Sequence, residues 1–173
     1  MPAANTNVGA VSSGIVHANG IDLWYERLGD EDGPVLLLVN GLGGQAIGWP
    51  EELCWGFVDR GFHVIRFDNR DAGLSQFIDA AVDVAAVAPA FLSGGAVPAP
   101  YLLADMAADT LGLLDALGIE RAHVLGASLG GMVAQLLAIE APQRVCSLTS
   151  LMSTTGDRAL LLPEAEVLAM LLR

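Results

Sequence analysis

Lysine is absent from this chain of 173 residues, and its eight Lys/Arg positions are all arginine. The arginines stand singly along the sequence, and twenty acidic residues bring the formal net charge to −12. A protein that grips the phosphate backbone of a nucleic acid needs clustered basic side chains. The composition therefore predicts that nucleic acid is not a partner.

Charged residues are scarce overall. They make up 16% of the chain, whereas hydrophobic residues make up 53%. A disordered chain would be poor in apolar residues, so disorder is excluded. The balance instead favours a sheet whose central strands are covered on both faces. The length suits one domain with a sizeable core.

Targeting and membrane-spanning signals are also lacking. Residues 1–14 have neither the basic start nor the apolar run of a signal peptide, so we expect a cytoplasmic protein. Residues 84–104 carry no charge over 21 positions, which is long enough for a membrane helix. Pro89, Pro98 and Pro100 would interrupt that helix repeatedly. The sequence thus predicts no membrane association.

The chain has only two cysteines, Cys54 and Cys146, each within an apolar stretch. No metal-ligand spacing accompanies them. We expect two buried free thiols of a cytosolic protein, and nothing in the sequence requires a metal ion or an organic cofactor.

Hydrophobic patterning predicts the elements of an α/β fold. Residues 14–17 and 21–28 alternate apolar and polar side chains around the Asn19-Gly20 turn, which is typical of an antiparallel hairpin. The uninterrupted apolar run 35–39 indicates a strand buried on both faces. The remaining pattern predicts, in order, helix 51–60, strand 62–67, helix 101–117, strand 122–125, helix 129–140, strand 145–152 and a helix over 163–173. This order predicts a mostly parallel sheet with helices on both faces and an antiparallel N-terminal hairpin.

The segment Gly126–Gly130 carries the clearest chemical signal. It reads Gly-x-Ser-x-Gly and lies between a predicted strand and a predicted helix. A serine on such a sharp turn stands clear of the sheet, and the flanking glycines permit close approach of neighbouring backbone. The following helix directs its N-terminal N–H groups at a developing oxyanion. We predict that Ser128 is a catalytic nucleophile in a nucleophile elbow.

A glycine-rich loop, Asn40–Gly44, follows the predicted strand 35–39. Acyl transfer needs two backbone N–H donors that face the oxyanion. In this architecture one comes from the residue after the nucleophile and the other from the loop after the third strand. We therefore predict that Leu129 and Leu42 form the oxyanion hole, although an ordinary glycine-rich turn remains the alternative for the loop.

Together, the Asn40-Gly41 loop and the segments Phe67–Ser75 and Gly126–Gly130 resemble the α/β-hydrolase superfamily. The segments Val39–Pro50 and His63–Ser75 most closely resemble its aclacinomycin methylesterase type. The resemblance covers about residues 14–155. It implies a serine hydrolase that cleaves a carboxylic ester of a fairly apolar small molecule through an acyl-enzyme. Dehalogenases and epoxide hydrolases of this superfamily use an aspartate nucleophile, which Ser128 disfavours.

Some positions depart from the superfamily pattern. Asn40 stands where many members have histidine, and we expect it to keep a structural role by hydrogen-bonding the loop. Asp71 and Ala72 stand where many have glycine. In the superfamily the turn that contains Asp68, Arg70 and Ser75 braces the elbow, with substrate contact as the alternative.

The chain contains no histidine after Ser128. A serine hydroxyl needs a base, and on this fold the acid and then the histidine follow the serine in the chain. His17, His63 and His123 all precede it, and we interpret them as structural or surface residues. Asp157 occupies a position where some members keep the acid, but an acid without its histidine makes no triad.

We therefore interpret the chain as the N-terminal part of a hydrolase, with residues 1–13 as a flexible N-terminus, 14–155 as the core and 156–173 as the start of a cap helix. The catalytic histidine, with an acid, would come from a C-terminal segment or a second chain that completes the fold. The alternative is a non-catalytic domain of the same fold that binds a small apolar ligand or a protein partner. Residues 84–104 are candidates for lining the acyl pocket of the enzyme, with a plain packing role as the alternative.

Overall fold

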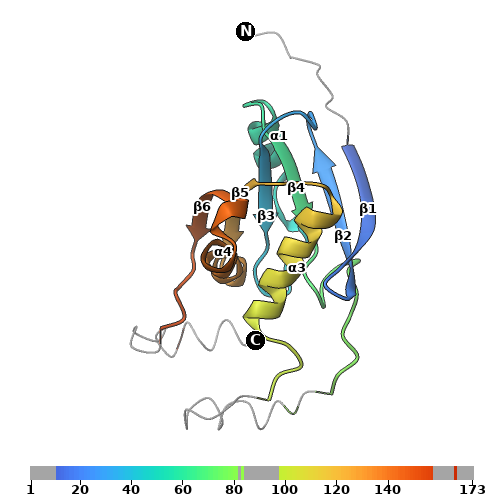
Figure 1. The fold of residues 1–173 in the computed structure, drawn as a ribbon, viewed down its shortest axis with the longest axis vertical. Helices are drawn as coiled ribbons and strands as arrows, with labels where there is room; N and C mark the ends of the chain where they lie inside the picture. The colour runs from blue at the N-terminus through green and yellow to red at the C-terminus, as the bar shows by residue number, and fades with distance from the viewer. Residues whose placement is uncertain (1–10, 82, 84–97, 158–165, 167–173) are drawn as a thin grey trace.

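The computed structural model describes residues 11–81, 83, 98–157 and 166. In this part of the chain, strands form one sheet in the order β1-β2-β4-β3-β5-β6 (Figure 1). The strands are β1 (Val11–Ala18), β2 (Ile21–Leu28), β3 (Val35–Val39), β4 (His63–Phe67), β5 (Ala122–Ala127) and β6 (Val145–Leu151). The helices are α1 (Glu51–Val58), α3 (Leu103–Ala116) and α4 (Leu129–Glu140), with 3-10 turns at Ala46–Gly48 and Pro142–Arg144.

The N-terminal hairpin is confirmed, and it begins at Val11, earlier than the predicted position 14. Strands β1 and β2 pair antiparallel around a two-residue turn. Asn19 and Gly20 have φ angles of 49° and 79°, the left-handed pair that such a turn requires. Strand β2 also pairs antiparallel with β4, which joins the hairpin to the rest of the sheet.

The central strands are parallel, as predicted. Strand β3 lies between β4 and β5 and pairs parallel with both, and β6 pairs parallel with β5. All five residues of β4 are buried, and so are four of the five in β3. The continuous apolar run of β3 is therefore explained by the cover on both faces of the sheet. Parallel strands also bring the loops after β3, β4 and β5 to one edge of the sheet, where ligands bind in α/β folds.

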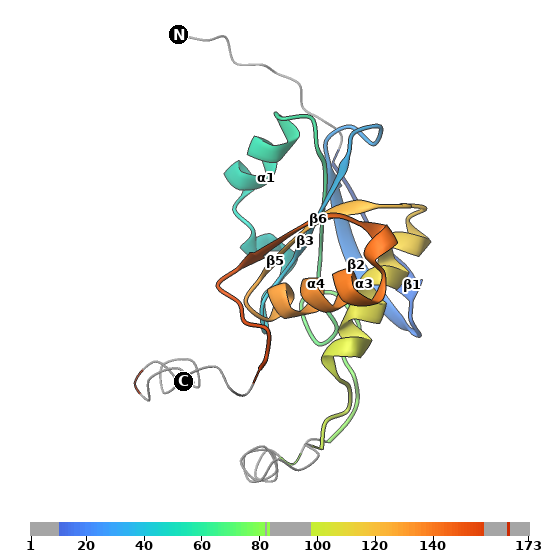
Figure 2. The same ribbon diagram turned by 60° about the vertical axis from the view of Figure 1, so that its left-hand side comes forward.

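Helices cover both faces of the sheet. Helices α3 and α4 lie on one face and α1 on the other (Figure 2). The larger core, beneath α3 and α4, contains Leu23, Leu37 and Phe67, and the smaller one, beneath α1, contains Leu38 and Val64. The confirmed fold class is thus a three-layer α/β sandwich.

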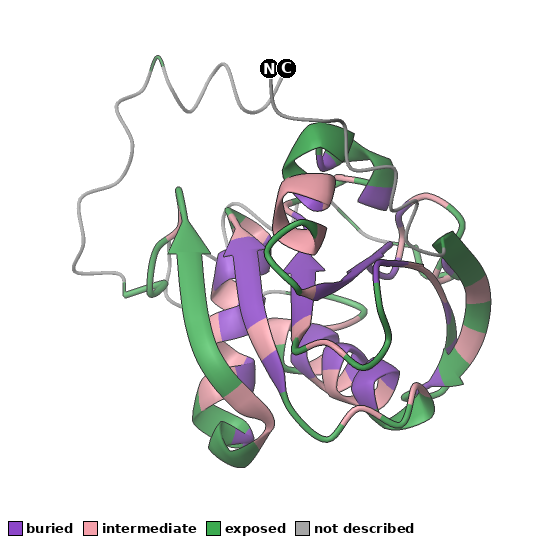
Figure 3. Ribbon diagram, turned by 90° about the horizontal axis from the view of Figure 1, so that it is seen from above, coloured by how far each residue is buried: buried purple, intermediate pink, exposed green. Residues whose placement is uncertain are grey.

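Strand β6 differs from the central strands because it forms an edge. Six of its seven residues are exposed, and in Figure 3 the outer strands are green where the inner ones are purple. This exposure corrects one expectation. Cys54 is buried as predicted, but Cys146 is exposed on β6. An apolar sequence neighbourhood predicted burial, but among the described residues β6 is an edge strand paired only with β5, and the thiol is exposed there.

Helix boundaries differ from the predictions by a few residues. Helix α3 begins at Leu103 rather than 101, where the Asp105 carboxylate accepts the Leu102 N–H at 2.7 Å. Gly118, with φ 71°, follows the helix as predicted. Residues 84–97 of the uncharged segment and nearly all of the predicted helix 163–173 lie outside the described residues. No helix in the described ranges is long and apolar enough to cross a membrane.

Candidate active site

Ser128 occupies the junction between β5 and α4, as the motif predicts. Its backbone has φ 53° and ψ −120°, a conformation that residues with a side chain rarely adopt. The residue is exposed although its neighbours on β5 are largely buried. The strained turn therefore presents the hydroxyl outside the sheet, at the edge where the loops converge.

The two flanking glycines are required by close backbone contacts. A Cβ on Gly126 would lie 2.2 Å from the carbonyl oxygen of Gly130. A Cβ on Gly130 would lie 2.2 Å from the carbonyl oxygen of Val39 and 2.5 Å from that of Asn40. No side chain fits in these spaces. The glycines thus let the first turn of α4 pack directly on the end of β3.

Backbone hydrogen bonds hold the strained serine in place. The Ser128 N–H donates to the Leu151 carbonyl at 2.8 Å. The Ser128 carbonyl accepts the Gly131 N–H at 2.9 Å and the Ser153 hydroxyl at 2.7 Å. Every one of these bonds uses backbone atoms of Ser128, so the side-chain hydroxyl is not needed to maintain the turn.

The glycine-rich loop after β3 lies against the serine. A Cβ on Gly41 would be 3.2 Å from Ser128 Cβ and 3.8 Å from its Oγ. The next residue, Leu42, and the first helical residue, Leu129, border one pocket beside the serine. The first amides of a helix have no intrahelical acceptor, so the Leu129 N–H is available to a bound group. The two predicted oxyanion residues are therefore neighbours in space.

Asn40 does not make the expected side-chain bond to the loop. It is buried, and its Nδ2 has no hydrogen-bond partner among the described residues. Instead, its backbone carbonyl accepts from the Asn69 Nδ2 at 3.1 Å. The loop is consequently anchored to the turn after β4 through main-chain atoms.

The turn after β4 makes the contacts of a brace. The buried carboxylate of Asp68 accepts the Ala46 N–H at 2.6 Å and the Leu74 N–H at 2.8 Å. The Ser75 hydroxyl donates to the Asp68 carbonyl at 2.6 Å and accepts the Trp24 N–H at 2.9 Å. These bonds connect the loops after β3 and β4 to strand β2. Neither Asp68 nor Ser75 is among the residues that line the pocket described below.

Arg70 forms a buried ion pair with Asp109 on α3. The guanidinium donates through Nε at 2.6 Å and through Nη2 at 2.7 Å, a two-point contact. Both side chains are more than nine-tenths buried. The Asn19 amide completes the pair by donating to Asp109 at 2.8 Å. Hydrogen bonding to Asp109 raises the pKa of Arg70 above its usual value.

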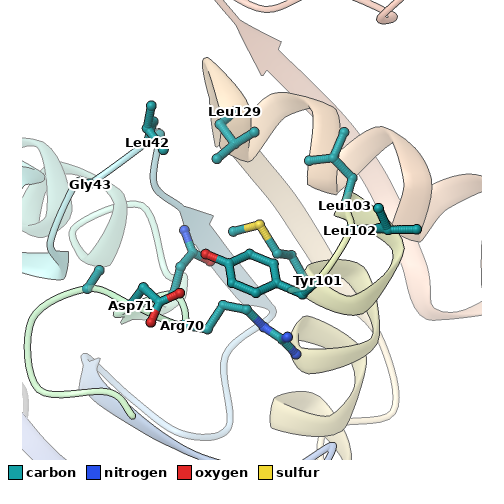
Figure 4. A pocket seen from close by; sticks show the side chains of 12 residues that line it. Leu42, Gly43, Arg70, Asp71, Tyr101, Leu102, Leu103 and Leu129 are labelled. Atoms are coloured by element: carbon teal, nitrogen blue, oxygen red, sulfur yellow. The ribbon is translucent and has the colours of Figure 1, made fainter. Parts of the chain in front are cut away.

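Figure 4 shows a pocket of about 310 Å³. Its lining includes Gly41, which lies against Ser128, and Leu129, which follows Ser128 in the chain. Its walls come from the loops after β3 and β4, from the start of α3 and from the start of α4. Tyr101 crosses it, with the Arg70 guanidinium 4.7 Å from its ring centre. Burial, and then the neighbouring Asp71 carboxylate, raises the pKa of Tyr101 to about 12. Asp71 has φ 61°, a second strained position at the site.

The histidines lie elsewhere. His17 is exposed and contacts Asp22 at 2.8 Å, and His123 contacts the Ser147 hydroxyl at 2.8 Å. His63 is buried at the start of β4, where burial and then the charge of Arg27 lower its pKa. None of the three lines the pocket, and neither does Asp157, which is exposed after β6. In the described ranges, no group of three or more His, Cys, Asp or Glu side chains is arranged to hold a metal.

Two residues of the site were missed from the sequence. Tyr101 was interpreted only as the start of a helix, and Asp109 was not singled out at all. Asp109 falls between the buried residues Met106 and Leu113 of α3. A carboxylate on the apolar face of a helix needs a buried partner, and this was the available signal.

Comparisons with known proteins agree with this geometry. A model of the α/β hydrolase fold family matches residues 34–171. The chain is 38% identical over 137 residues to rhodomycin D methylesterase DnrP from Streptomyces peucetius, covering 79% of this chain and 41% of that protein. It is 39% identical over 126 residues to the proposed carbamate hydrolase RutD from Variovorax paradoxus, covering 73% and 40%.

A solved structure shows the same arrangement. Epoxide hydrolase A from Mycobacterium thermoresistibile superposes with a TM-score of 0.66 and 28% identity, covering 82% of this chain and 39% of that one. The chain thus spans about two fifths of the length of the curated relatives it matches.

Proposed function

Because the chain belongs to the α/β-hydrolase fold family, we propose that it is the nucleophile-bearing part of a serine hydrolase that cleaves a carboxylic ester of a fairly apolar small molecule. Two features support the ester as substrate. The pocket beside Ser128 is lined mainly by apolar atoms, and a relative with 38% identity is named as a methylesterase. A serine nucleophile also disfavours the aspartate chemistry of epoxide hydrolases.

In the proposed reaction, Ser128 Oγ attacks the ester carbonyl and its proton passes to a base. The carbonyl oxygen becomes an oxyanion that the N–H groups of Leu42 and Leu129 stabilise. Collapse of this intermediate releases the alcohol and leaves an acyl-serine, which water then hydrolyses to the acid. Removal of one such N–H donor in a hydrolase costs about 10²–10³ in kcat.

The base is proposed to come from a C-terminal segment or a second chain. No histidine follows Ser128, and none of the three that precede it lines the pocket. The loops around the site also expose large apolar side chains to solvent, which is typical of a surface that binds another polypeptide segment. The exposed side chains on these loops are Leu42, Leu74, Phe77, Leu102 and Met152.

The strained backbone at Ser128 is the observation that carries the proposal. A serine at φ 53° costs about 1–3 kcal/mol, and such strain persists where function requires it. Intact-mass spectrometry of the native preparation, before and after a fluorophosphonate probe, tests the assignment. We expect one adduct on this chain at Ser128, together with a second polypeptide or a longer chain that supplies the base.

A matched control exists within the chain. Ser147 is exposed and already has a histidine, His123, within hydrogen-bond distance, but it lies in an ordinary strand. Ser128→Ala should abolish the adduct, whereas Ser147→Ala should leave it unchanged. An adduct that persists in Ser128→Ala would refute the nucleophile assignment.

The second candidate is a non-catalytic domain that binds a small apolar ligand or a protein partner. The missing histidine favours it. Imidazole added to the purified 173-residue chain separates the two, since it substitutes for an absent base. Labelling of Ser128 that increases with imidazole concentration supports the hydrolase. No labelling under any condition, with this chain alone in the native preparation, supports the binding domain.

A further inference from the structure

One wall of the pocket beside Ser128 is polar, in contrast to the rest. There Asp71 and Tyr101 both line the pocket, and Figure 4 shows the tyrosine ring extending across it above Arg70. The Asp71 carboxylate accepts the Ile78 N–H at 2.6 Å. The acidic group that this wall offers to a ligand is the Asp71 carboxylate.

The nearby arginine does not neutralise that carboxylate. Arg70 is held at two points by Asp109 and is buried, so its charge is matched within the protein. Asp68 is buried with both oxygens bonded to backbone amides, and Asp105 caps the start of α3. The charged residues among those that line the pocket are Arg70 and Asp71. Because Asp109 matches the charge of Arg70, the charge that a bound group meets in the pocket is the Asp71 carboxylate.

We infer that the Asp71 carboxylate sets the charge selectivity of this pocket, so that the pocket accepts an uncharged or cationic apolar group and excludes an anionic one. The inference deepens the proposed function and rests on it in one respect: the pocket ligand is taken to be a substituent of the ester cleaved at Ser128. The substrate class becomes an ester whose apolar portion bears no acid group. A product acid would also be repelled from the pocket, which favours its release.

The size of the effect follows from Coulomb's law. Two unit charges about 7 Å apart, in a medium between protein and water, repel each other enough to change affinity roughly tenfold. The pocket is open to solvent on one side, so a much larger factor is not expected. Salt at high concentration should reduce the factor further.

Three small molecules of nearly the same shape test the inference without catalysis. They are choline, which is cationic, its uncharged analogue 3,3-dimethylbutan-1-ol, and the anion 3,3-dimethylbutanoate. Binding to the full chain can be followed by chemical-shift changes of the methyl and amide groups around the pocket. We expect the anion to bind about tenfold more weakly than the uncharged analogue.

Two variants identify the residue responsible. Asp71→Asn removes the charge, keeps an oxygen for the Ile78 N–H and suits the left-handed backbone, because asparagine tolerates positive φ well. It should bring the anion and the uncharged analogue to within about twofold of each other. Tyr101→Phe keeps the ring against Arg70 and leaves the carboxylate charged, so discrimination against the anion should persist or increase.

Equal binding of the anion and the uncharged analogue by the wild-type chain would overturn the inference. So would a preference that Asp71→Asn leaves unchanged. Fluorophosphonate labelling of the same samples separates the two proposals. Charge selectivity that depends on Asp71, in a chain never labelled at Ser128, would keep the selective pocket and remove the hydrolase. Labelling at Ser128 without charge selectivity would keep the hydrolase and remove the selective pocket.

Discussion

Replacement of Gly130 by alanine tests whether the elbow depends on direct backbone packing. The added Cβ would lie 2.2 Å from the Val39 carbonyl oxygen and 2.5 Å from the Asn40 carbonyl oxygen. Both atoms belong to the end of β3, in the middle of the sheet, so no side-chain rotation relieves the contact. Helix α4 must move away from β3 by about 1 Å to restore an ordinary separation.

The expected cost follows from this displacement. Overpacking of a well-packed site costs about 1–3 kcal/mol, and a clash with backbone belongs at the upper end. Alanine recovers up to about 1 kcal/mol through its better helix propensity. We therefore expect a net loss of about 2 kcal/mol in the free energy of unfolding. For a chain of this size that loss lowers Tm by about 4–8 °C.

Urea denaturation followed by tryptophan fluorescence measures the change. Gly48→Ala is the matched control, since nothing lies within 4 Å of a Cβ there and the backbone is not left-handed. The control should be neutral or slightly stabilising. If Gly130→Ala unfolds at the same urea concentration as the wild-type chain, the close packing of α4 on β3 is refuted as the reason for this glycine.

Three further outcomes follow from buried or exposed polar groups. Arg70→Met should cost about 3–5 kcal/mol in urea denaturation by leaving the Asp109 carboxylate buried without its cation, and an effect below 1 kcal/mol would contradict the pairing. The pKa of His63 is lowered in the folded chain, so below pH about 6.5 its imidazole binds a proton in the unfolded chain while it stays neutral in the folded chain. Stability should therefore decrease as pH falls below that value, and His63→Gln should show a weaker decrease between pH 6.5 and 5. A thiol reagent should modify the exposed Cys146 quickly and the buried Cys54 only on unfolding, since burial also raises the pKa of the Cys54 thiol; equal rates would contradict the exposed edge.

The sequence predicted the strands and the elbow because both depend on local patterns. Apolar runs such as 35–39 require cover on two faces, and the Asn19-Gly20 pair suits only a tight turn. The local Gly-x-Ser-x-Gly pattern likewise predicted that Ser128 lies between a strand and a helix. The element boundaries shifted by up to three residues, as at Val11 and Leu103, where pairing and capping decide the end of an element.

Features that depend on distant contacts could not be predicted in this way. Cys146 lies in an apolar stretch, but it is exposed because β6 is the edge strand of the described part of the sheet. Tyr101 and Asp71 line the same pocket although they lie thirty positions apart in the sequence, and only the fold brings them together. Asn40 was expected to bond the loop through its side chain, yet the backbone carbonyl makes the contact. Such pairings are tertiary, and no local pattern encodes them.

The strain at Ser128 leads to a prediction that separates function from folding. The turn is held by the Ser128 N–H and carbonyl, and its hydroxyl takes no part in those bonds. At φ 53° and ψ −120° a glycine avoids the clash that a Cβ creates. Ser128→Gly should therefore raise the free energy of unfolding by up to about 1 kcal/mol while abolishing labelling, and Ser128→Ala should abolish labelling with no gain. If glycine instead destabilised the chain by more than alanine does, the hydroxyl or Cβ would have a structural role, and the strain could no longer be attributed to catalysis.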